Sequence, residues 1–376
     1  MARLASSTTT GTFRAKPDAV MASGGVALAG QLKVKVDGLE VPDLLAGMID
    51  CVIEHRRTTP SSCTATFSNW GPTPTGVGYL HFGRVTLDFG KGFTVAFGEA
   101  DLFHGRIATL EGGFPEGSPP VIRIVAGDAL ADLAEHNGFR TFSDMSDADV
   151  VRRVASEYGL STQLRLTGPS RRVIAQAGES DLEFIRARLA AIGAYCWIDT
   201  RGRLCAVHEP GGREAAILLN YGGNLTEFCV RADVRRQSTA ARARGWDIAA
   251  KESLSSSADQ TVLTSEIPAT GCAGAWIRES IFGSAERRLA EPALGSATEV
   301  ESVARAAFAD RAREFLTGIA HLADARQVLP GRRVDIRGVG PLFSGLYRIE
   351  TVTHRFDLTR GCRTEFTVER PWLGAP

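Results

Sequence analysis

The stretch LKVKVDG at residues 32–38 alternates apolar and charged residues and then stops at an Asp-Gly pair. Successive side chains of a strand point to opposite faces, so this alternation predicts a half-buried strand that ends in a hairpin turn. Similar short runs follow, separated by Gly and Pro turns, at residues 51–54, 63–67, 85–89, 93–97 and 121–125. Together they predict an antiparallel β-barrel or sandwich.

Beyond this β-rich region the apolar period changes from two to that of a helix. Ser146 and Asp149 have the spacing of a capping box ahead of an apolar helical stripe, and Ser180 and Glu183 repeat it. A Thr-Arg-Gly turn between two apolar runs then predicts a small hairpin. We interpret residues 131–215 as a compact α/β insert.

Strand patterns return after the insert and continue to the end of the sequence. We therefore predict an α+β, mainly β protein built on a roughly doubled plan, with two similar antiparallel β-barrel domains and α/β insertions. The expected parts are a flexible segment at 1–25, a first barrel at 26–130, the insert at 131–215, and a second barrel at 216–376 with an insertion around 253–297 and a helix around 298–318.

The apolar phase changes within one of the last strands. Tyr347 and Ile349 are at odd positions, whereas Val352, His354 and Phe356 are at even ones. An extra residue between the two groups would restore one apolar face, so a β-bulge is predicted there. His354 then lies on a half-buried strand, where we favour a hydrogen-bonded core imidazole over a catalytic base.

Charge and composition indicate a globular protein of two to three domains with no general affinity for polyanions. Lys plus Arg equals Asp plus Glu at 43 each in 376 residues, and 44% of residues are hydrophobic. The basic pairs Arg235–Arg236 and Arg242 with Arg244 have no interleaved aromatic residues, so we interpret them as a solvated surface. Neither nucleic acid nor membrane is an expected partner.

The seven cysteines are scattered and never form a C-x-x-C pair, which favours reduced thiols and synthesis in the cytoplasm. A Cys51–Cys63 crosslink between neighbouring strands stays open as an alternative. The N-terminal residues lack the apolar core of a secretion signal, and no run of about twenty apolar residues follows.

The common catalytic signatures are absent from the sequence, including the phosphate-binding P-loop, G-x-S-x-G and H-E-x-x-H. No two of the seven histidines fall within five residues of each other, so no local zinc motif exists. Glu179, Asp181 and Glu183 could be paired carboxylates of a glycosidase, but helix capping explains two of them. We expect no catalytic, cofactor or metal residues and no enzyme.

Several motifs, in order, resemble those of the phage late control gene D family. They are residues 32–38 (LKVKVDG), 127–130 (GDAL), 146–151 (SDADVV), 179–185 (ESDLEFI) with 193–204, and 329–370. Members of that family are baseplate hub proteins of contractile tails, and they also form the first part of type VI spike (VgrG) proteins. The resemblance covers residues 26–372 and implies tail-tube-like barrels.

The resemblance implies a structural role: a homotrimer whose three chains present six similar domains, as a pseudo-sixfold adaptor between the tail tube and a threefold central spike. The expected partners are other copies of the chain, the spike, a tube or tube-initiator protein and baseplate wedge proteins. The chain would be made in the cytoplasm and assembled into a phage tail or injection particle. No spike segment follows Arg370 in this sequence, so a separate spike is expected unless the chain continues into a fused spike. A tail-tip peptidoglycan hydrolase and a carbohydrate-binding adhesion module stay as alternatives.

Overall fold

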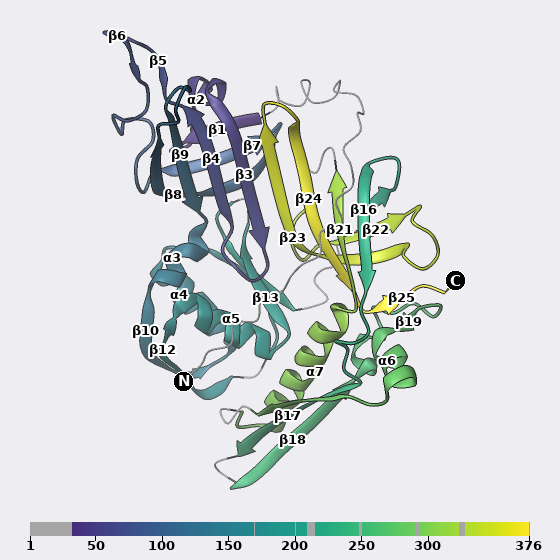
Figure 1. The fold of residues 1–376 in the computed structure, drawn as a ribbon. Helices are drawn as coiled ribbons and strands as arrows, with labels where there is room; N and C mark the ends of the chain where they lie inside the picture. Colours follow the sequence, from purple (N-terminus) through teal and green to yellow (C-terminus); the bar gives the residue numbers. More distant parts are fainter. Residues whose placement is uncertain are drawn as a thin grey trace, which may run out of the picture.

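A computed structural model describes residues 32–168, 170–199, 201–208, 215–247, 250–290, 294–322 and 328–375. The protein is mainly β, and one large sheet contains strands from both the first and the last part of the described chain (Figure 1). The predicted flexible segment at 1–25 lies outside the described residues. Two units that contain the longer helices lie below the sheet in Figure 1, one under each half.

The large sheet has thirteen strands. Its first half consists of β1 (Leu32–Val36), β2 (Leu39–Glu40), β3 (Met48–Arg56), β4 (Ser62–Ser68), β7 (Gly92–Phe97), β8 (Ala100–Gly113) and β9 (Val121–Gly127). Its second half consists of β15 (Ile217–Asn220), β16 (Leu225–Ala232), β21 (Leu316–Leu322), β22 (Arg333–Arg337), β23 (Gly345–Asp357) and β24 (Gly361–Arg370).

The two halves have the same strand order. Neighbours follow the order β3-β4-β9-β8-β7-β1 in the first half and β16-β21-β24-β23-β22-β15 in the second. Their irregularities also agree, because β3 and β16 each shift register near their start, and β8 and β23 each shift within the strand. The difference is at the outer strand: β15 pairs in parallel with β22, whereas β1 pairs antiparallel with β7. The doubled plan is therefore a property of the backbone.

The prediction of two separate β-barrels is not confirmed, because no sheet formed by the described residues closes on itself. Instead, β3 of the first half pairs antiparallel with β23 of the second and joins the halves into one sheet. Phe356 of β23 packs in the core of the first half. Unpaired backbone groups at a sheet edge need partners, and here the two halves supply them to each other.

The insert between the halves has its own hydrophobic core, which includes a Phe142–Phe184 ring stack at 5.8 Å. Both capping boxes are confirmed, and so is the small hairpin β13–β14. The elements are α3 (Ala129–Glu135), β10 (Asn137–Met145), α4 (Asp147–Glu157), β11 (Thr162–Arg165), β12 (Arg171–Ser180), α5 (Asp181–Ala191), β13 (Ala194–Ile198) and β14 (Leu204–His208).

A second inserted unit interrupts the second half between β16 and β21. Its elements are β17 (Ala240–Asp247), β18 (Glu252–Asp259), η1 (Gln260–Leu263), β19 (Cys272–Ala273), α6 (Gly274–Phe282), β20 (Glu286–Ala290) and α7 (Ala297–Arg313), and β19 pairs with the final strand β25 (Trp372–Leu373). Arg171 of the insert binds Glu299 of α7 at 2.6 Å and Asp147 at 3.5 Å, which ties the two units together.

Two local predictions are corrected by tertiary contacts. Residues 85–89 form no strand, because only Leu87 points inward while Val85 and Phe89 are exposed. The first half also contains α2 (Pro42–Ala46) and a hairpin of β5 (Trp70–Thr73) with β6 (Gly76–Tyr79). The helix expected to end at Gly318 ends at Arg313. Gly318 lies in β21, where an added Cβ would meet the Phe228 ring at 2.7 Å.

The predicted bulge in the late strand is confirmed. The register of β23 against β24 shifts between Ile349 and Thr351. The shift leaves Tyr347, Ile349, Val352 and Phe356 all buried. The change of apolar phase in the sequence therefore reports one buried face interrupted by an extra residue.

Candidate functional site

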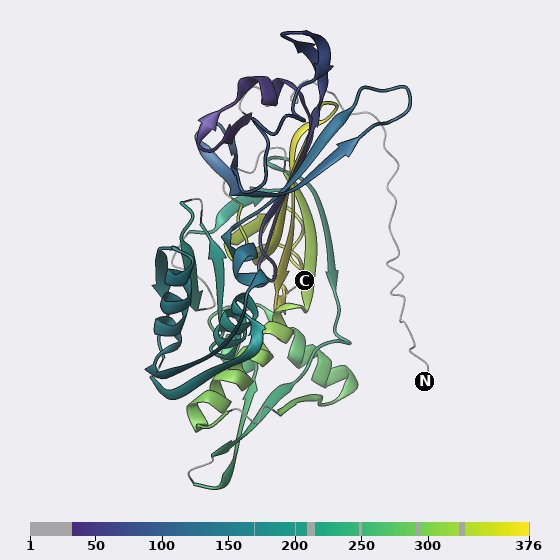
Figure 2. The same cartoon turned by 90° about the vertical axis from the view of Figure 1, so that its left-hand side faces the viewer.

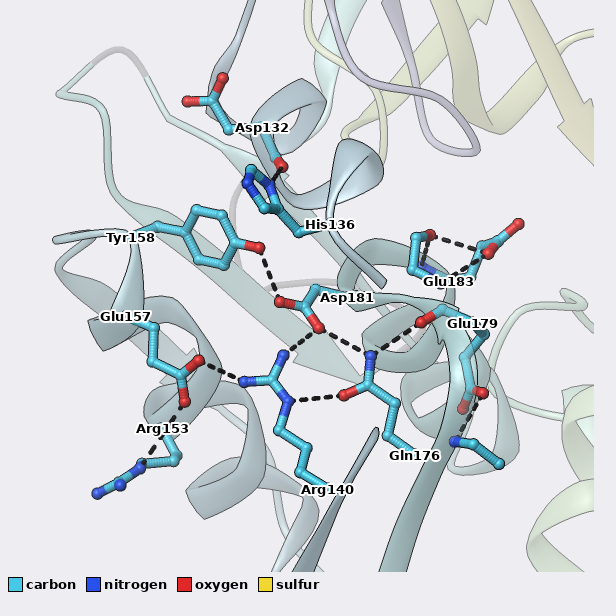
Figure 3. A network of polar contacts seen from close by, with 12 residues as sticks. Asp132, His136, Arg140, Arg153, Glu157, Tyr158, Gln176, Glu179, Asp181 and Glu183 are labelled. Atoms are coloured by element: carbon cyan, nitrogen blue, oxygen red, sulfur yellow. Dashed lines mark hydrogen bonds and ion pairs between the residues drawn. The ribbon is translucent and has the colours of Figure 1, made fainter. Parts of the chain in front are cut away.

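The three carboxylates considered as glycosidase residues lie around the start of α5 (Figure 3). Asp181 is buried and forms an ion pair with Arg140, while Tyr158 Oη donates to it at 2.7 Å and Gln176 Nε2 at 2.8 Å. Burial alone would raise the pKa of Asp181, but these hydrogen bonds outweigh it and hold the pKa below its usual range. Arg140 also binds Glu157. Asp181 is thus an ionised anchor for β10, α4 and β12.

The other two carboxylates have structural partners as well. Glu183 accepts hydrogen bonds from Ser180 N at 3.0 Å and Ser180 Oγ at 2.9 Å, and these bonds lower its pKa. Glu179 accepts from Ala177 N at 2.9 Å. A glycosidase acid needs a raised pKa, whereas the pKa of Asp181 and that of Glu183 are both lowered. The contacts of these three carboxylates are those of residues that stabilise the fold of the insert.

Two histidines meet at the junction between the halves, with His354 buried and His55 half-buried. His354 Nδ1 lies 2.8 Å from Thr364 Oγ1, and His55 Nε2 donates to the Leu102 carbonyl oxygen at 2.9 Å. Their ring centroids are 5.9 Å apart. Burial lowers the pKa of His55 to about 4 and that of His354 to about 3, so both are neutral at pH 7. His55 could not be singled out from the sequence, because its partner is distant in the chain.

The described residues contain no group of three or more side chains suited to a metal ion. No cysteine of the described residues forms a disulfide, and the Cys51 and Cys63 sulfurs lie 3.7 Å apart as a hydrogen-bonded pair of thiols. The basic residues 235, 236 and 244 are exposed, and Arg242 pairs with Glu286 at 2.8 Å. No helix in the described ranges is both long and apolar enough to span a bilayer.

A cavity of about 750 Å³ lies between the insert and the second half. Several arginines line it, and each of three is bound to a carboxylate of the same chain. Arg57 binds Glu350 at 2.5 Å, Arg313 binds Glu266 at 2.6 Å, and Arg348 binds Glu369. Because these three arginines are neutralised by carboxylates of the same chain, we interpret the cavity as a polar contact region between units and not as a binding site for an anion.

Two strand edges carry unpaired backbone groups. The outer edge of β16 has no partner strand among the described residues, and residues 109–113 of β8 pair only with β9. The other outer strands, β2 and β15, are only two and four residues long. In Figure 1, β8 and β16 lie toward opposite sides of the sheet, and Figure 2 shows the β8–β9 hairpin extending away from the body. Long free edges are sites where another chain adds a strand.

An aromatic cluster lies beside the free part of β8. It contains Trp70, Tyr79, Phe82 and Phe114, with Tyr79 stacked on Phe82 at 5.0 Å and Phe114 64% exposed. Phe82 and Phe114 cover Gly112, whose added Cβ would meet them at 3.2 and 3.4 Å. Exposed aromatic groups of this kind mark protein interfaces. Neither this cluster nor the free edge was predicted from the sequence.

Solved structures with a similar fold are tail proteins. The 43 kDa tail protein of prophage MuSo2 from Shewanella oneidensis has a TM-score of 0.70 and 14% identity, over 91% of this chain and 98% of that one. A tail protein from Neisseria meningitidis has a TM-score of 0.68 and 13% identity, over 90% and 96%. An Escherichia coli type VI secretion component, described as similar to T4 bacteriophage tail proteins, reaches 0.55 and 13%, over 90% and 76%.

The fold is therefore one that phage tail proteins and a tail-like secretion component share. The chain belongs to the Alg8 N-terminal domain family, whose model matches residues 90–357. That description names a domain and no activity. No curated protein matches the sequence significantly. The finer resemblance to the late control gene D family stays a prediction.

Proposed function

We propose that this chain is a structural subunit of a phage tail or tail-derived injection machine, and that its place is the baseplate hub. The observation that carries the proposal is the six-strand order that occurs twice in one sheet. A trimer of such a chain presents six equivalent units, so one ring can match a sixfold tail tube on one side and a threefold spike on the other.

The duplicated sheet also accounts for the missing barrels. In a ring, the open sheets of three copies would continue into one another around a lumen, so closure becomes a property of the assembly. The proposed domains are tube-like units at 26–130 and 216–376 and the insert at 131–215. This arrangement agrees with the late control gene D motifs and with the tail-protein fold.

The proposed partners are two further copies of the chain, the central spike, a tube or tube-initiator protein, and the baseplate wedges. The protein is made in the cytoplasm and becomes part of a virion or injection particle. The protein functions in assembly and catalyses no reaction. The carboxylates near α5 support this role, since neither Asp181 nor Glu183 has the raised pKa of a general acid.

The test is the mass in solution, measured by light scattering for the purified chain alone and with its candidate spike and tube proteins. The hub proposal predicts a mass three times the 40.2 kDa of one chain, with copurification of at least one tail partner. A monomer under every condition, or release of sugars from peptidoglycan by the purified chain, would contradict it.

A further inference from the structure

The junction between the two halves is a candidate template for a contact between two copies of the chain. Within one chain, β3 runs antiparallel to the second part of β23, with Glu54 opposite Thr353. If the halves are equivalent, each strand of this pair has a counterpart in the other half. The counterpart of β3 is β16, and the counterpart of β23 is β8.

The register of β8 and β23 fixes which residues correspond. Arg106 of β8 and Arg348 of β23 each precede the register shift by the same number of residues. Each is also opposite a strand, β7 or β22, that ends its pairing at the same point. Counting five residues on from each arginine leads to Glu111 in the first half and to Thr353 in the second.

The register of β3 and β16 can be followed across the sheet in the same way. From the β9 residue opposite Arg106, two steps lead through Ser62 to Glu54. In the second half, two steps from the β24 residue opposite Arg348 lead through Thr317 to Arg231. Arg231 therefore corresponds to Glu54. The register shifts of β3 and β16 fall at the same distance from these two residues, which supports the alignment.

We propose that the free edge of β16 adds to residues 109–113 of β8 in a second copy of the chain, antiparallel, with Arg231 opposite Glu111 of that copy. This contact rests on the ring proposed above and specifies its interface. It would repeat between copies the strand pairing that β3 and β23 make within each copy.

The side chains that this register brings together are complementary. Arg231 is 77% exposed and Glu111 is 52% exposed, and opposite charges directly across an antiparallel pair stabilise it. Their contacts within the chain are surface ion pairs, Arg231 with Asp233 at 2.6 Å and Glu111 with Arg123 at 3.5 Å. Exposed pairs of this kind contribute little, so both groups can rearrange.

The same register places apolar groups on one face. Val230 comes opposite Gly112, and two residues further along Phe228 comes opposite the exposed Phe114. Val230 and Phe228 are half-buried against the core of the second half, and Gly112 carries the aromatic cluster of the first half. The contact would thus cover an exposed aromatic patch as well as the backbone groups of two edges.

The geometry makes the contact head-to-tail, because the two edges belong to opposite ends of the sheet (Figure 1). A head-to-tail contact uses two different surfaces, so it either closes a ring or continues as a filament. Three copies would give a ring in which junctions within a chain alternate with junctions between chains.

A disulfide trap tests the register directly. In a Cys229→Ser background, Glu111→Cys with Arg231→Cys puts two thiols directly opposite, where Cβ atoms are about 4.5–5.5 Å apart and small shifts allow a bond. Mild oxidation should give a covalent trimer on a non-reducing gel. The matched control, Glu111→Cys with Glu227→Cys in the same background, moves one thiol four residues along, about 13 Å away, and should stay monomeric.

Charge reversal gives a second readout. Glu111→Lys or Arg231→Glu alone puts like charges opposite in every contact and should raise the dissociation constant about fivefold or more per contact. The double variant exchanges the two charges and should restore assembly. A stable trimer with no crosslink and no effect of reversal would overturn this interface and leave the hub intact. A monomer that neither crosslinks nor assembles with tail partners would overturn both.

Discussion

The two halves of the large sheet share one strand order but differ in what covers their edges. In the first half, the edge strand β3 is paired on both sides, with β4 and with β23. In the second half, β21 is the one strand of the described residues that pairs with the equivalent strand β16, whose side chains alternate between partly buried and exposed. The first half is also continuous between its two equivalent strands, whereas the second admits a whole inserted unit there.

The difference teaches that one backbone pattern can serve both folding and assembly. Where both partners belong to one chain, the pairing becomes a junction with two histidine rings side by side and shared core residues. At β16, where no described strand takes the place of β23, the same pattern leaves an edge along a strand of eight residues. A free edge of that length is a hazard for a monomer, so its retention favours a partner.

The largest expected effect comes from a charge at the covered edge. Ile53 in β3 is 2% exposed, and Ile53→Asp would bury an unpaired carboxylate, costing about 4 kcal/mol or more and preventing the chain from folding. The matched variant at the equivalent half-buried position, Val230→Asp, should cost about 1–2 kcal/mol and leave a folded monomer that no longer assembles. Solubility, circular dichroism and light scattering distinguish the two. A folded, assembled Ile53→Asp protein would break the comparison.

Acid should weaken the covered junction. His55 has a pKa of about 4 in the folded chain and an ordinary value of 6.5. Below pH 6.5 the unfolded state therefore binds more protons, and the free energy of unfolding decreases as the pH is lowered. The loss from His55 is on the order of 3 kcal/mol and is complete near pH 4. His354, whose folded pKa is about 3, adds a loss in the same direction.

The measurement is urea unfolding of the wild type and of His55→Gln with His354→Gln at pH 7.5 and pH 4.5. Burial raises the pKa of Glu369 and acts in the opposite direction, so the difference between the two proteins isolates the histidines. The equivalent positions, Gly112 and Ala232, carry no titrating group. The contact between copies should therefore lack this acid sensitivity, and an equal loss in both proteins would refute the role of the histidine pair.

A smaller effect is expected from the ion pairs beside the junction. Glu350 binds Arg57 at 2.5 Å and Arg348 at 3.1 Å in a partly buried place. Glu350→Gln should cost about 2 kcal/mol of unfolding free energy, because it leaves partly desolvated guanidinium groups with weaker partners. Glu365→Gln, at an exposed pair, should change stability by less than about 0.5 kcal/mol. Equal effects in thermal unfolding would contradict this ranking.

The smallest effect should come from Glu179 in the insert, outside both halves. Glu179→Ala removes one hydrogen bond to Ala177 and should cost less than about 1 kcal/mol, with particle assembly and infection or injection unchanged. Asp181→Ala, which leaves Arg140 without its buried partner, should cost about 3 kcal/mol. A folded Glu179→Ala protein with severe loss of infection would favour the hydrolase alternative.

Local features were predictable because their signal lies within a few residues. The turn after β1 has Asp37 and Gly38 at positive φ, 48° and 80°, as an Asp-Gly turn requires. Both capping boxes place a Ser beside a carboxylate three residues on, and both form. The bulge in β23 followed from the shift in apolar phase.

Other elements escaped prediction because their residues are satisfied from far away in the chain. The ribbon β10–β12 is mostly exposed along β10, so it has no apolar alternation, and its anchor joins Arg140 to Asp181, 41 residues apart. A glycine such as Gly318 commonly follows the end of a helix, but here it lies in a strand, because the Phe228 ring occupies the space that a side chain would need. Burial of Leu87 alone could not make residues 85–89 a strand.

Periodicity and short spacing were enough to establish the β-rich class, the two capped helices of the insert, the doubled plan and the lack of local catalytic motifs. The tertiary structure alone decided that the halves form one open sheet, which residues meet at the β3–β23 junction, and which edges stay free. Strand pairing joins residues about 300 positions apart through backbone groups that every residue carries, so the side-chain pattern cannot specify the partner.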